Sequence, residues 1–252
     1  MDSKERFSNR VEAYAKYRPG YPKEAVDCLY NEAGFRPDSV IADVGAGTGI
    51  FSKLLLERGS RVIAVEPNDA MRAAAEQSLG GHPNFEAVPG SAESTELPDQ
   101  SVDFVVCAQS FHWFDREAAK REFRRILKPG GKVVILWYTR RTKGHPAVED
   151  YERLLQTYAI DYQKVSHRNV TPSMLLSFFK EGTMRERRFG MQLEYDFDGL
   201  KGFVLSSSYC PLPGHPNYEP MMAELRNLFD RYGRDGTVIF GYETEIYWGE
   251  VS

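Results

Sequence analysis

The sequence predicts an α/β fold, a doubly wound and mostly parallel sheet of seven strands with helices on both faces. Two observations carry this prediction. In the first half of the chain, short and nearly continuous apolar runs alternate with segments of helical spacing, as is typical of a parallel sheet covered on both faces. Near the carboxyl end, two long segments alternate strictly between apolar and polar residues, which favours an antiparallel pair at the edge of the sheet.

Five apolar runs predict the parallel strands. They are residues 40–44, 61–65, 84–88, 102–108 and 132–138. Two short helices are expected before the first strand, because Phe7, Val11 and Tyr14 share a helical face and Pro22 suits the first turn of a second helix. Further helices are expected after Phe51, from Asn68 to Leu79, and from the capping residue Asp115 to Lys128.

From residue 140 the alternation of strands and helices stops. Apolar spacing predicts one helix at 148–158 and another that begins at Thr171-Pro172, which together form a helical insertion at 140–182. Period-two segments at 189–197 and 238–248 predict the last two strands, with a helix around Leu225 between them. We interpret residues 1–252 as a single domain with a helical cover at 1–34.

Composition restricts the class of protein. The chain has 252 residues, with 32 Lys and Arg against 36 Asp and Glu, and this mild acidity argues against a protein held on nucleic acid by bulk charge. The apolar run at 133–138 is far too short to span a bilayer, and residues 1–10 lack the apolar core of a signal peptide. We therefore expect a cytoplasmic protein without membrane binding. Its five histidines show no metal-ligand spacing, so no metal is expected.

A glycine-rich loop follows the first predicted strand. Its sequence is Asp43-Val-Gly-Ala-Gly-Thr-Gly49, and its glycines would let a ligand approach the backbone at the positive end of the next helix. A dinucleotide fingerprint would need glycine at position 50, where this chain has Ile50. Asp43 would repel a pyrophosphate and attract an ammonium group, so the loop favours a zwitterionic ligand. A tight turn without any ligand is the alternative.

The second predicted strand ends at Glu66. A carboxylate at this position can accept hydrogen bonds from both hydroxyls of a ribose. NAD-binding folds use the same arrangement, so Glu66 favours a nucleoside without selecting a cofactor. A solvated carboxylate at a strand end is the alternative.

Together these motifs resemble those of class I S-adenosylmethionine-dependent methyltransferases. The resemblance covers residues 40–138 and is carried by Asp43 to Gly49, Glu66-Pro67, Gly90-Ser-Ala-Glu93, Leu97-Pro98, Val102-Asp-Phe104 and Leu127-Lys-Pro-Gly-Gly131. The segments 7–21, Ser110-Phe-His-Trp-Phe114, 205–209 and 242–249 resemble the trans-aconitate-methyltransferase-like branch. The resemblance implies a Rossmann-like fold with strand order 3-2-1-4-5-7-6, strand 7 antiparallel, and S-adenosyl-L-methionine as cofactor.

The resemblance also implies roles for individual residues. Arg18 would close over the site with Tyr14 and pair with the cofactor carboxylate. The cofactor-binding residues implied in this way are Tyr14, Arg18, Asp43, Gly45, Gly47, Thr48, Gly49, Glu66, Pro67, Met71, Ser91, Ala92, Glu93 and Gln109.

The sequence defines the residues that would contact the methyl acceptor less well than those that would bind the cofactor. His112 is the candidate catalytic base, because it lies next to the expected transfer site and an imidazole with a pKa of about 6.5 suits proton removal. A carboxylate acceptor needs no base, so a structural or substrate-binding histidine is an open alternative. Trp113, Trp137 and Tyr138 are candidate substrate contacts.

The implied function is methyl transfer by direct displacement to a small-molecule acceptor, with a carboxylic acid or another oxygen nucleophile as one option. The chain would act as a monomer or homodimer. Alternatives are a non-catalytic S-adenosylmethionine-binding regulator or scaffold, and a methyltransferase acting on RNA or protein, against which the near-neutral charge counts. An NAD-dependent oxidoreductase is disfavoured by Ile50.

Overall fold

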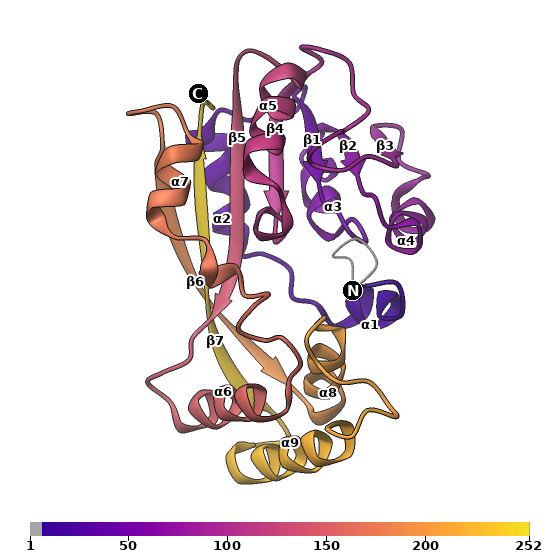
Figure 1. Ribbon diagram of the computed structural model, residues 1–252, viewed down its shortest axis with the longest axis vertical. Helices are drawn as coiled ribbons and strands as arrows, with labels where there is room; N and C mark the ends of the chain where they lie inside the picture. The colour runs from indigo at the N-terminus through magenta and orange to yellow at the C-terminus, as the bar shows by residue number, and fades with distance from the viewer. Residues whose placement is uncertain (1–6, 252) are drawn as a thin grey trace.

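The computed structural model describes residues 7–251 and contains a seven-stranded sheet of order β3-β2-β1-β4-β5-β7-β6 (Figure 1). The strands are β1 (Val40–Val44), β2 (Arg61–Val65), β3 (Phe85–Val88), β4 (Val102–Ala108), β5 (Leu127–Arg140), β6 (Arg185–Tyr195) and β7 (Val238–Gly249). Strands β1 to β5 pair in parallel, whereas β7 runs antiparallel to both β5 and β6. The predicted fold class, strand order and antiparallel strand are therefore confirmed.

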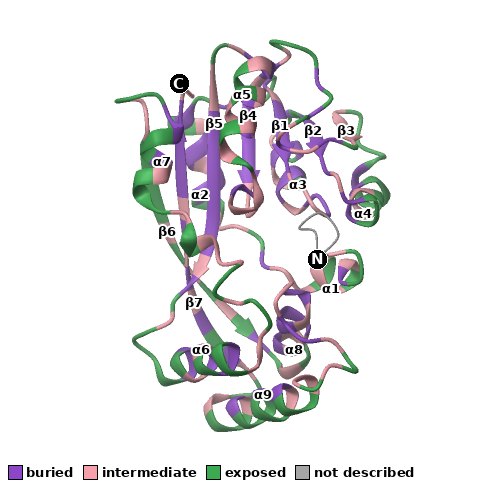
Figure 2. Cartoon of the chain, in the orientation of Figure 1, coloured by how far each residue is buried: buried purple, intermediate pink, exposed green. Residues whose placement is uncertain are grey.

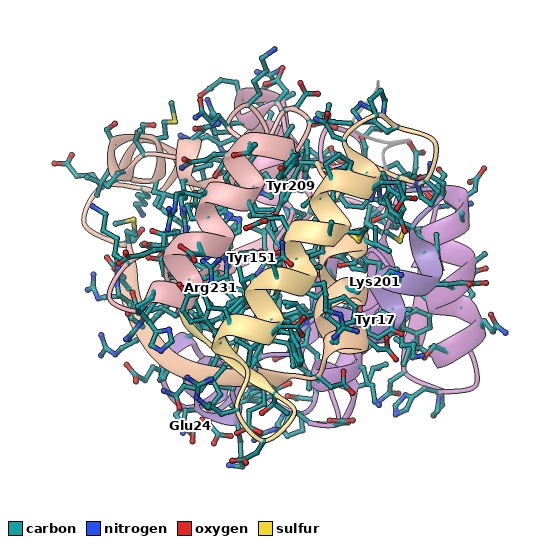
Figure 3. All side chains as sticks on the ribbon, turned by 90° about the horizontal axis from the view of Figure 1, so that it is seen from below. Tyr17, Glu24, Tyr151, Lys201, Tyr209 and Arg231 are labelled. Atoms are coloured by element: carbon teal, nitrogen blue, oxygen red, sulfur yellow. The ribbon has the colours of Figure 1, made fainter. Side chains whose placement is uncertain are left out.

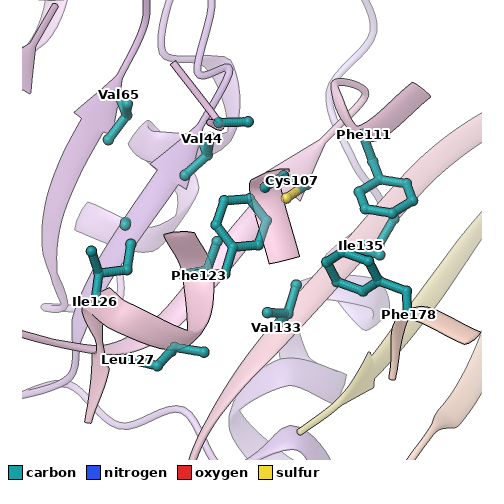
Figure 4. Packing of buried hydrophobic residues seen from close by; sticks show 14 of the residues in the cluster. Val44, Val65, Cys107, Phe111, Phe123, Ile126, Leu127, Val133, Ile135 and Phe178 are labelled. Atoms are coloured by element: carbon teal, nitrogen blue, oxygen red, sulfur yellow. The ribbon is translucent and has the colours of Figure 1, made fainter. Parts of the chain in front are cut away.

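Helices bury both faces of the sheet. On one face lie α5 (Arg116–Ile126) and α7 (Pro172–Phe178), and on the other lie α2 (Lys23–Cys28), the π-helical turn η1 (Leu29–Ala33) and α3 (Ile50–Leu56). Figure 4 shows Phe123 of α5 and Phe178 of α7 packed near Cys107 and Ile135 of the strands. Because both faces are covered, the central strands are buried along most of their length (Figure 2), which explains their continuous apolar runs.

The antiparallel pair of β6 and β7, whose connection contains α8 and α9, extends beyond the rest of the sheet. β5 pairs with β7 only between Tyr242 and Gly249, whereas β6 pairs with β7 along its whole length. The end of this strand pair that extends past β5 packs in a separate apolar cluster with α6 (Pro146–Tyr158), α8 (Phe197–Ser206) and α9 (Tyr218–Tyr232). This part of the molecule is termed the lower lobe, and Figure 3 shows α6 and α9 side by side with Tyr151 between them.

The amino-terminal helix α1 (Val11–Tyr17) rests on α8 of the lower lobe. The Tyr17 ring packs so closely on α8 that a Cβ at Gly202 would lie 2.2 Å from its Cδ2 atom. Arg10 also donates hydrogen bonds to the carbonyl oxygens of Leu205 and Cys210. Residues 1–6 of the cover expected at 1–34 lie outside the described residues.

Two expectations about the second half of the chain need correction. The segment expected as one insertion at 140–182 divides, because α6 joins the lower lobe while α7 packs on the sheet beside α5. Phe197 was expected on a strand but begins α8, since the Asp196 carboxylate accepts a hydrogen bond from the Gly199 amide at 2.7 Å and caps that helix. Gly199 and Gly202 lower the helix propensity of this segment, so the sequence pattern did not predict that α8 begins at Phe197.

The remaining helix, α4 (Asp69–Leu79), flanks β3. Within residues 7–251, every helix is too short or too polar to cross a lipid bilayer.

Gly49 connects the glycine-rich loop to α3, and its substitution should test how tightly α3 and α4 pack. Its φ is 80°, and a Cβ there would lie 2.7 Å from Leu79 Cδ1. Gly49→Ala combines a left-handed backbone with this clash, so we expect a loss of about 2–4 kcal/mol in the free energy of unfolding. The control, Gly130→Ala, has a φ of 78° with no atom within 4 Å, and should lose only about 1–2 kcal/mol. Equal losses in urea denaturation would show that α4 moves aside freely.

Candidate functional site

Two cavities lie beside the carboxyl ends of β1, β2 and β4, which is where ligands bind in open α/β sheets. The loop cavity is lined by the glycine-rich loop, the end of β2 and the start of α4. The arginine cavity is lined by Arg18, Arg140 and Arg168 together with side chains from the lower lobe. The two cavities share the side chains of Phe7, Tyr14, Gln109 and Trp113 as walls.

Most of the residues implied for cofactor binding line the loop cavity. They are Tyr14, Gly45, Gly47, Glu66, Pro67, Met71, Ser91, Ala92, Glu93 and Gln109. Asp43, Thr48 and Gly49 line neither cavity, because the chain turns away from the opening before Thr48 and buries Asp43 beneath the loop. The structure therefore places these three behind the cavity wall instead of in it.

Glu66 connects the loop to the second strand. Its Oε2 accepts a hydrogen bond from the Gly47 amide at 2.8 Å, and its Oε1 accepts one from the Asn68 amide at 2.9 Å. Burial raises the pKa of this carboxyl, while the two amides act in the opposite direction. Each carboxylate oxygen has a second lone pair, so Glu66 can still accept hydrogen bonds from a pair of vicinal hydroxyls.

Asp43 supports the loop from below. The Ser52 hydroxyl, on α3, donates to Asp43 Oδ2 at 2.6 Å and so joins the helix to β1. Among the described residues, Asp43 Oδ1 has no hydrogen-bond partner, although the side chain is fully buried. Burial raises the pKa of Asp43 to about 7.

Gln109 and Tyr14 stand where the two cavities meet. Gln109 follows β4 in a left-handed conformation with φ of 63°, and its buried Nε2 has no partner among the described residues. An unused buried donor at this point indicates a place for a ligand acceptor atom. Burial raises the pKa of Tyr14 to about 12, so its phenol is neutral.

Arg18 lines the arginine cavity and not the loop cavity, and its implied pairing with the cofactor carboxylate stays a prediction. Its guanidinium donates to the Ser206 carbonyl at 3.2 Å and the Ser207 hydroxyl at 3.3 Å, and lies 5.0 Å from the centre of the Tyr14 ring. Within residues 7–251, no carboxylate forms an ion pair with Arg18. A half-buried cation without a counter-ion favours an anionic ligand.

The other two arginines of this cavity differ in their partners. Arg140 forms an ion pair with Glu152 of α6 at 2.6 Å, whereas Arg168 donates to the Arg140 carbonyl at 2.7 Å. Among the described residues that line the arginine cavity there is no aspartate or glutamate. The cavity is therefore electropositive.

The aromatic residues expected near the acceptor separate into two sets. Trp113 and Tyr138 line the arginine cavity together with His112. Trp137 lines neither cavity and is almost fully buried, and its indole nitrogen donates to His112 Nδ1 at 3.3 Å. Burial, with smaller effects of His167 and Arg18, lowers the pKa of His112 to about 3.

Two polar residues of the loop cavity were not expected from the sequence. Asn68 caps α4 by accepting a hydrogen bond from the Met71 amide at 3.0 Å. Its position before a helical segment predicted the start of the helix but not a place in the cavity wall. Ser110 donates to the Val44 carbonyl at 2.6 Å and lies where a Cβ on Gly45 would come within 2.5 Å of its own Cβ. Nothing in the sequence pattern indicates this contact, since the two residues are 65 positions apart.

The part of the chain that the structure describes has no group of three or more His, Cys, Asp and Glu side chains arranged to hold a metal ion.

Comparisons with known proteins agree with this geometry. Residues 42–135 match the family model of a methyltransferase domain. An uncharacterized methyltransferase of Mycobacterium tuberculosis is 42% identical over 138 residues, which are 53% of this chain and 52% of that protein. An uncharacterized methyltransferase-like protein of Schizosaccharomyces pombe is 36% identical over 156 residues, 62% of this chain and 59% of its own length. The chain thus spans about half the length of the curated relatives it matches.

Solved structures show the same fold. A protein of Anaeromyxobacter dehalogenans, provisionally named a type II methyltransferase, superposes with a TM-score of 0.70 at 24% identity, over 93% of this chain and 98% of that one. A protein of Anabaena variabilis, provisionally named a methyltransferase from an antibiotic biosynthesis pathway, gives a TM-score of 0.58 at 24% identity, over 88% and 96%. Residues 42–135 therefore match a methyltransferase domain, and the chain as a whole shares the fold of these solved structures.

The buried Asp43 should make the stability of the ligand-free protein depend on pH. Its pKa is raised from about 4 in the unfolded chain to about 7, so its contribution is intact below pH 4, falls as pH rises, and is lost above pH 7. Relative to Asp43→Asn, the wild-type protein should lose roughly 4 kcal/mol in the free energy of unfolding across this range. Urea denaturation from pH 4.5 to 8 measures the difference. A difference between wild type and Asp43→Asn that does not change with pH would refute the prediction.

Proposed function

We propose that this protein transfers a methyl group from S-adenosylmethionine to a small-molecule oxygen acceptor, with the methyl donor in the loop cavity and the acceptor in the arginine cavity. The observation that carries the proposal is the shared wall of Tyr14, Gln109 and Trp113. Two ligands that occupy these cavities would meet beside the same three side chains, as a direct transfer requires.

The loop cavity has the chemistry for the cofactor. Glu66 offers carboxylate oxygens for ribose hydroxyls, while Pro67, Met71 and Ala92 supply apolar walls suited to an adenine ring. Backbone at Gly45 and Gly47 lies open to the ligand. When bound, S-adenosylmethionine supplies a methyl group already activated on a sulfonium sulfur.

The arginine cavity supports an acceptor that carries negative charge. Among the described residues, Arg18 has no ion-pair partner and no carboxylate lines the cavity to repel such a ligand. This favours a carboxylic acid or another oxygen nucleophile, in agreement with the resemblance to the trans-aconitate-methyltransferase-like branch. Walls from α1, from residues 162–168 and from the lower lobe surround the cavity, which favours a small molecule over RNA or protein.

The residues of this chain would then act mainly by position. The acceptor oxygen forms a bond to the methyl carbon as the carbon–sulfur bond breaks, and the electron pair of that bond stays on sulfur. The aromatic walls at Tyr14 and Trp113 would exclude water and align the two ligands, an effect that can contribute roughly 7–11 kcal/mol to catalysis.

A methyl-transfer assay with S-adenosylmethionine labelled in its methyl group tests the proposal. The panel contains small mono-, di- and tricarboxylic acids, phenols and amines. We expect transfer to an acid, with a product whose label is released by mild alkali as expected for a methyl ester. Binding of S-adenosylmethionine without transfer to any compound would favour the regulator or scaffold alternative.

Removal of the Glu66 carboxylate should weaken cofactor binding. Glu66→Ala deletes a charge-assisted acceptor and leaves the Gly47 and Asn68 amides unpaired, so we expect a loss of about 1–3 kcal/mol in binding free energy. Calorimetric titration with S-adenosylmethionine and S-adenosylhomocysteine measures it. Glu86→Ala, on the exposed edge strand β3, is the control and should bind as the wild type does. An unchanged dissociation constant for folded Glu66→Ala would contradict the assignment of the loop cavity.

Arg18 should affect the acceptor and not the cofactor. Because its guanidinium lies in the arginine cavity, Arg18→Gln should raise the KM of an acidic acceptor about 10- to 100-fold, the loss of one charge-assisted contact. The dissociation constant of S-adenosylhomocysteine should change less than threefold. Lys16→Gln removes an exposed charge from the same helix and serves as control. The opposite result, a weaker cofactor with an unchanged acceptor KM, would favour pairing of Arg18 with the cofactor carboxylate.

A further inference from the structure

Two histidine rings that line the arginine cavity both contact the buried ring of Trp137. His112 belongs to the 3₁₀ turn η2 (Phe111–Trp113), Trp137 to β5, and His167 to the 3₁₀ turn η3 (His167–Asn169). Trp137 donates from Nε1 to His112 Nδ1 at 3.3 Å. The ring of His167 stacks on Trp137, with centroids 6.0 Å apart and an interplanar angle of 20°.

The bond from Trp137 determines where His112 can carry a proton. An indole N–H donates and cannot accept, so His112 Nδ1 must use its lone pair and carries no hydrogen. A neutral imidazole then has its proton on Nε2. A proton on Nδ1 would set two donors against each other, both in the alternative neutral tautomer and in the charged ring.

The second ring nitrogen of His112 is free to meet a ligand. Within residues 7–251, His112 Nε2 has no hydrogen-bond partner, and it is not among the polar atoms that are fully enclosed. His112 lines the arginine cavity and not the loop cavity. The Nε2 atom is therefore accessible, in a ring that lines the cavity to which we assign the acceptor.

We propose that Trp137 is a positioning residue that holds His112 as its Nε2–H tautomer, so that His112 donates a hydrogen bond to the acceptor and does not remove a proton from it. The role toward an acceptor rests on the proposed function, whereas the tautomer can be measured without it. The acceptor oxygen then enters already ionised, and the Nε2–H and the Arg18 guanidinium orient it. No proton has to leave during transfer.

The charged and titratable groups around His112 agree with a neutral ring. His167 and Arg18 face it from η3 and from the end of α1, and both disfavour a positive charge on His112. Trp113 lies against the ring with centroids 4.8 Å apart and carries no charge. Within residues 7–251, the cavity lining contains no carboxylate that would stabilise an imidazolium.

Nuclear magnetic resonance of the ¹⁵N-labelled protein tests the tautomer directly, with and without S-adenosylhomocysteine. Long-range ¹H–¹⁵N spectra identify which ring nitrogen carries the proton, and the signals of His112 are assigned by their absence in His112→Gln. We expect a proton on Nε2 alone from pH 8.5 down to pH 5.5. A proton on Nδ1, or an imidazolium that forms with a midpoint near pH 6.5, would overturn the proposal.

The role of Trp137 has its own readout in the wild-type protein. A scalar coupling across the hydrogen bond should connect Trp137 Nε1 with His112 Nδ1, and its absence would contradict the positioning role. Trp137→Phe should then let His112 populate both tautomers and raise its titration midpoint. Trp248→Phe, a buried tryptophan in the cluster on the other face of the sheet, is the matched control and should leave His112 unchanged. An unchanged tautomer in folded Trp137→Phe would also overturn the proposal.

Two substitutions separate donor from base once an acceptor is identified by the labelled-methyl assay. Gln places an amide N–H near the position of Nε2, whereas Asn places its amide near Nδ1. Donation predicts that His112→Gln retains at least tenfold more kcat/KM than His112→Asn, with no ionisation near pH 6.5 in the wild-type profile. Equal and severe losses in both variants, together with such an ionisation, would indicate a base.

Discussion

A buried carboxylate at the end of β2 organises the loop cavity. Glu66 receives the Gly47 amide from the loop after β1 and the Asn68 amide from the start of α4, so one side chain fixes three segments relative to one another. Asn68 in turn caps α4 and donates to the Ser8 hydroxyl near the amino terminus. Without a hydrogen-bond acceptor at this point, the Gly47 and Asn68 amides would lose their partners.

The sequence predicted the parts of the fold whose pattern is local. Strands β1, β2 and β4 are buried on both faces, so their residues had to be apolar in succession, and the alternation of β7 follows from one drier face. The glycine-rich loop was predictable because close approach to the backbone limits the residue types that fit, whereas ribose binding by Glu66 stays a prediction. Helix α8 was not predictable from the sequence. Gly202 leaves room for the Tyr17 ring, and a glycine lowers the local helix propensity.

The division of the site into two cavities could not be derived from spacing. Arg18 stands close to Tyr14 in the sequence, and only the seating of α1 on α8 directs its guanidinium to the carbonyl of Ser206. The same holds for His112, whose neighbour Trp137 is 25 positions away and meets it because β4 and β5 are paired. Contacts of this kind depend on how the layers pack, and no residue-level pattern records them.

The seating of α1 on the lower lobe joins the two cavities energetically. Tyr14 belongs to α1 and lines both cavities, while Tyr17, Arg10 and Arg18 attach that helix and its ends to α8 and the residues that follow it. On the proposed assignment of the two cavities, an acceptor that fixed the lower lobe would also fix one wall of the loop cavity. The affinities of the two ligands would then be linked, and such linkage is reciprocal: whatever factor the first ligand adds to the binding of the second, the second adds to the first.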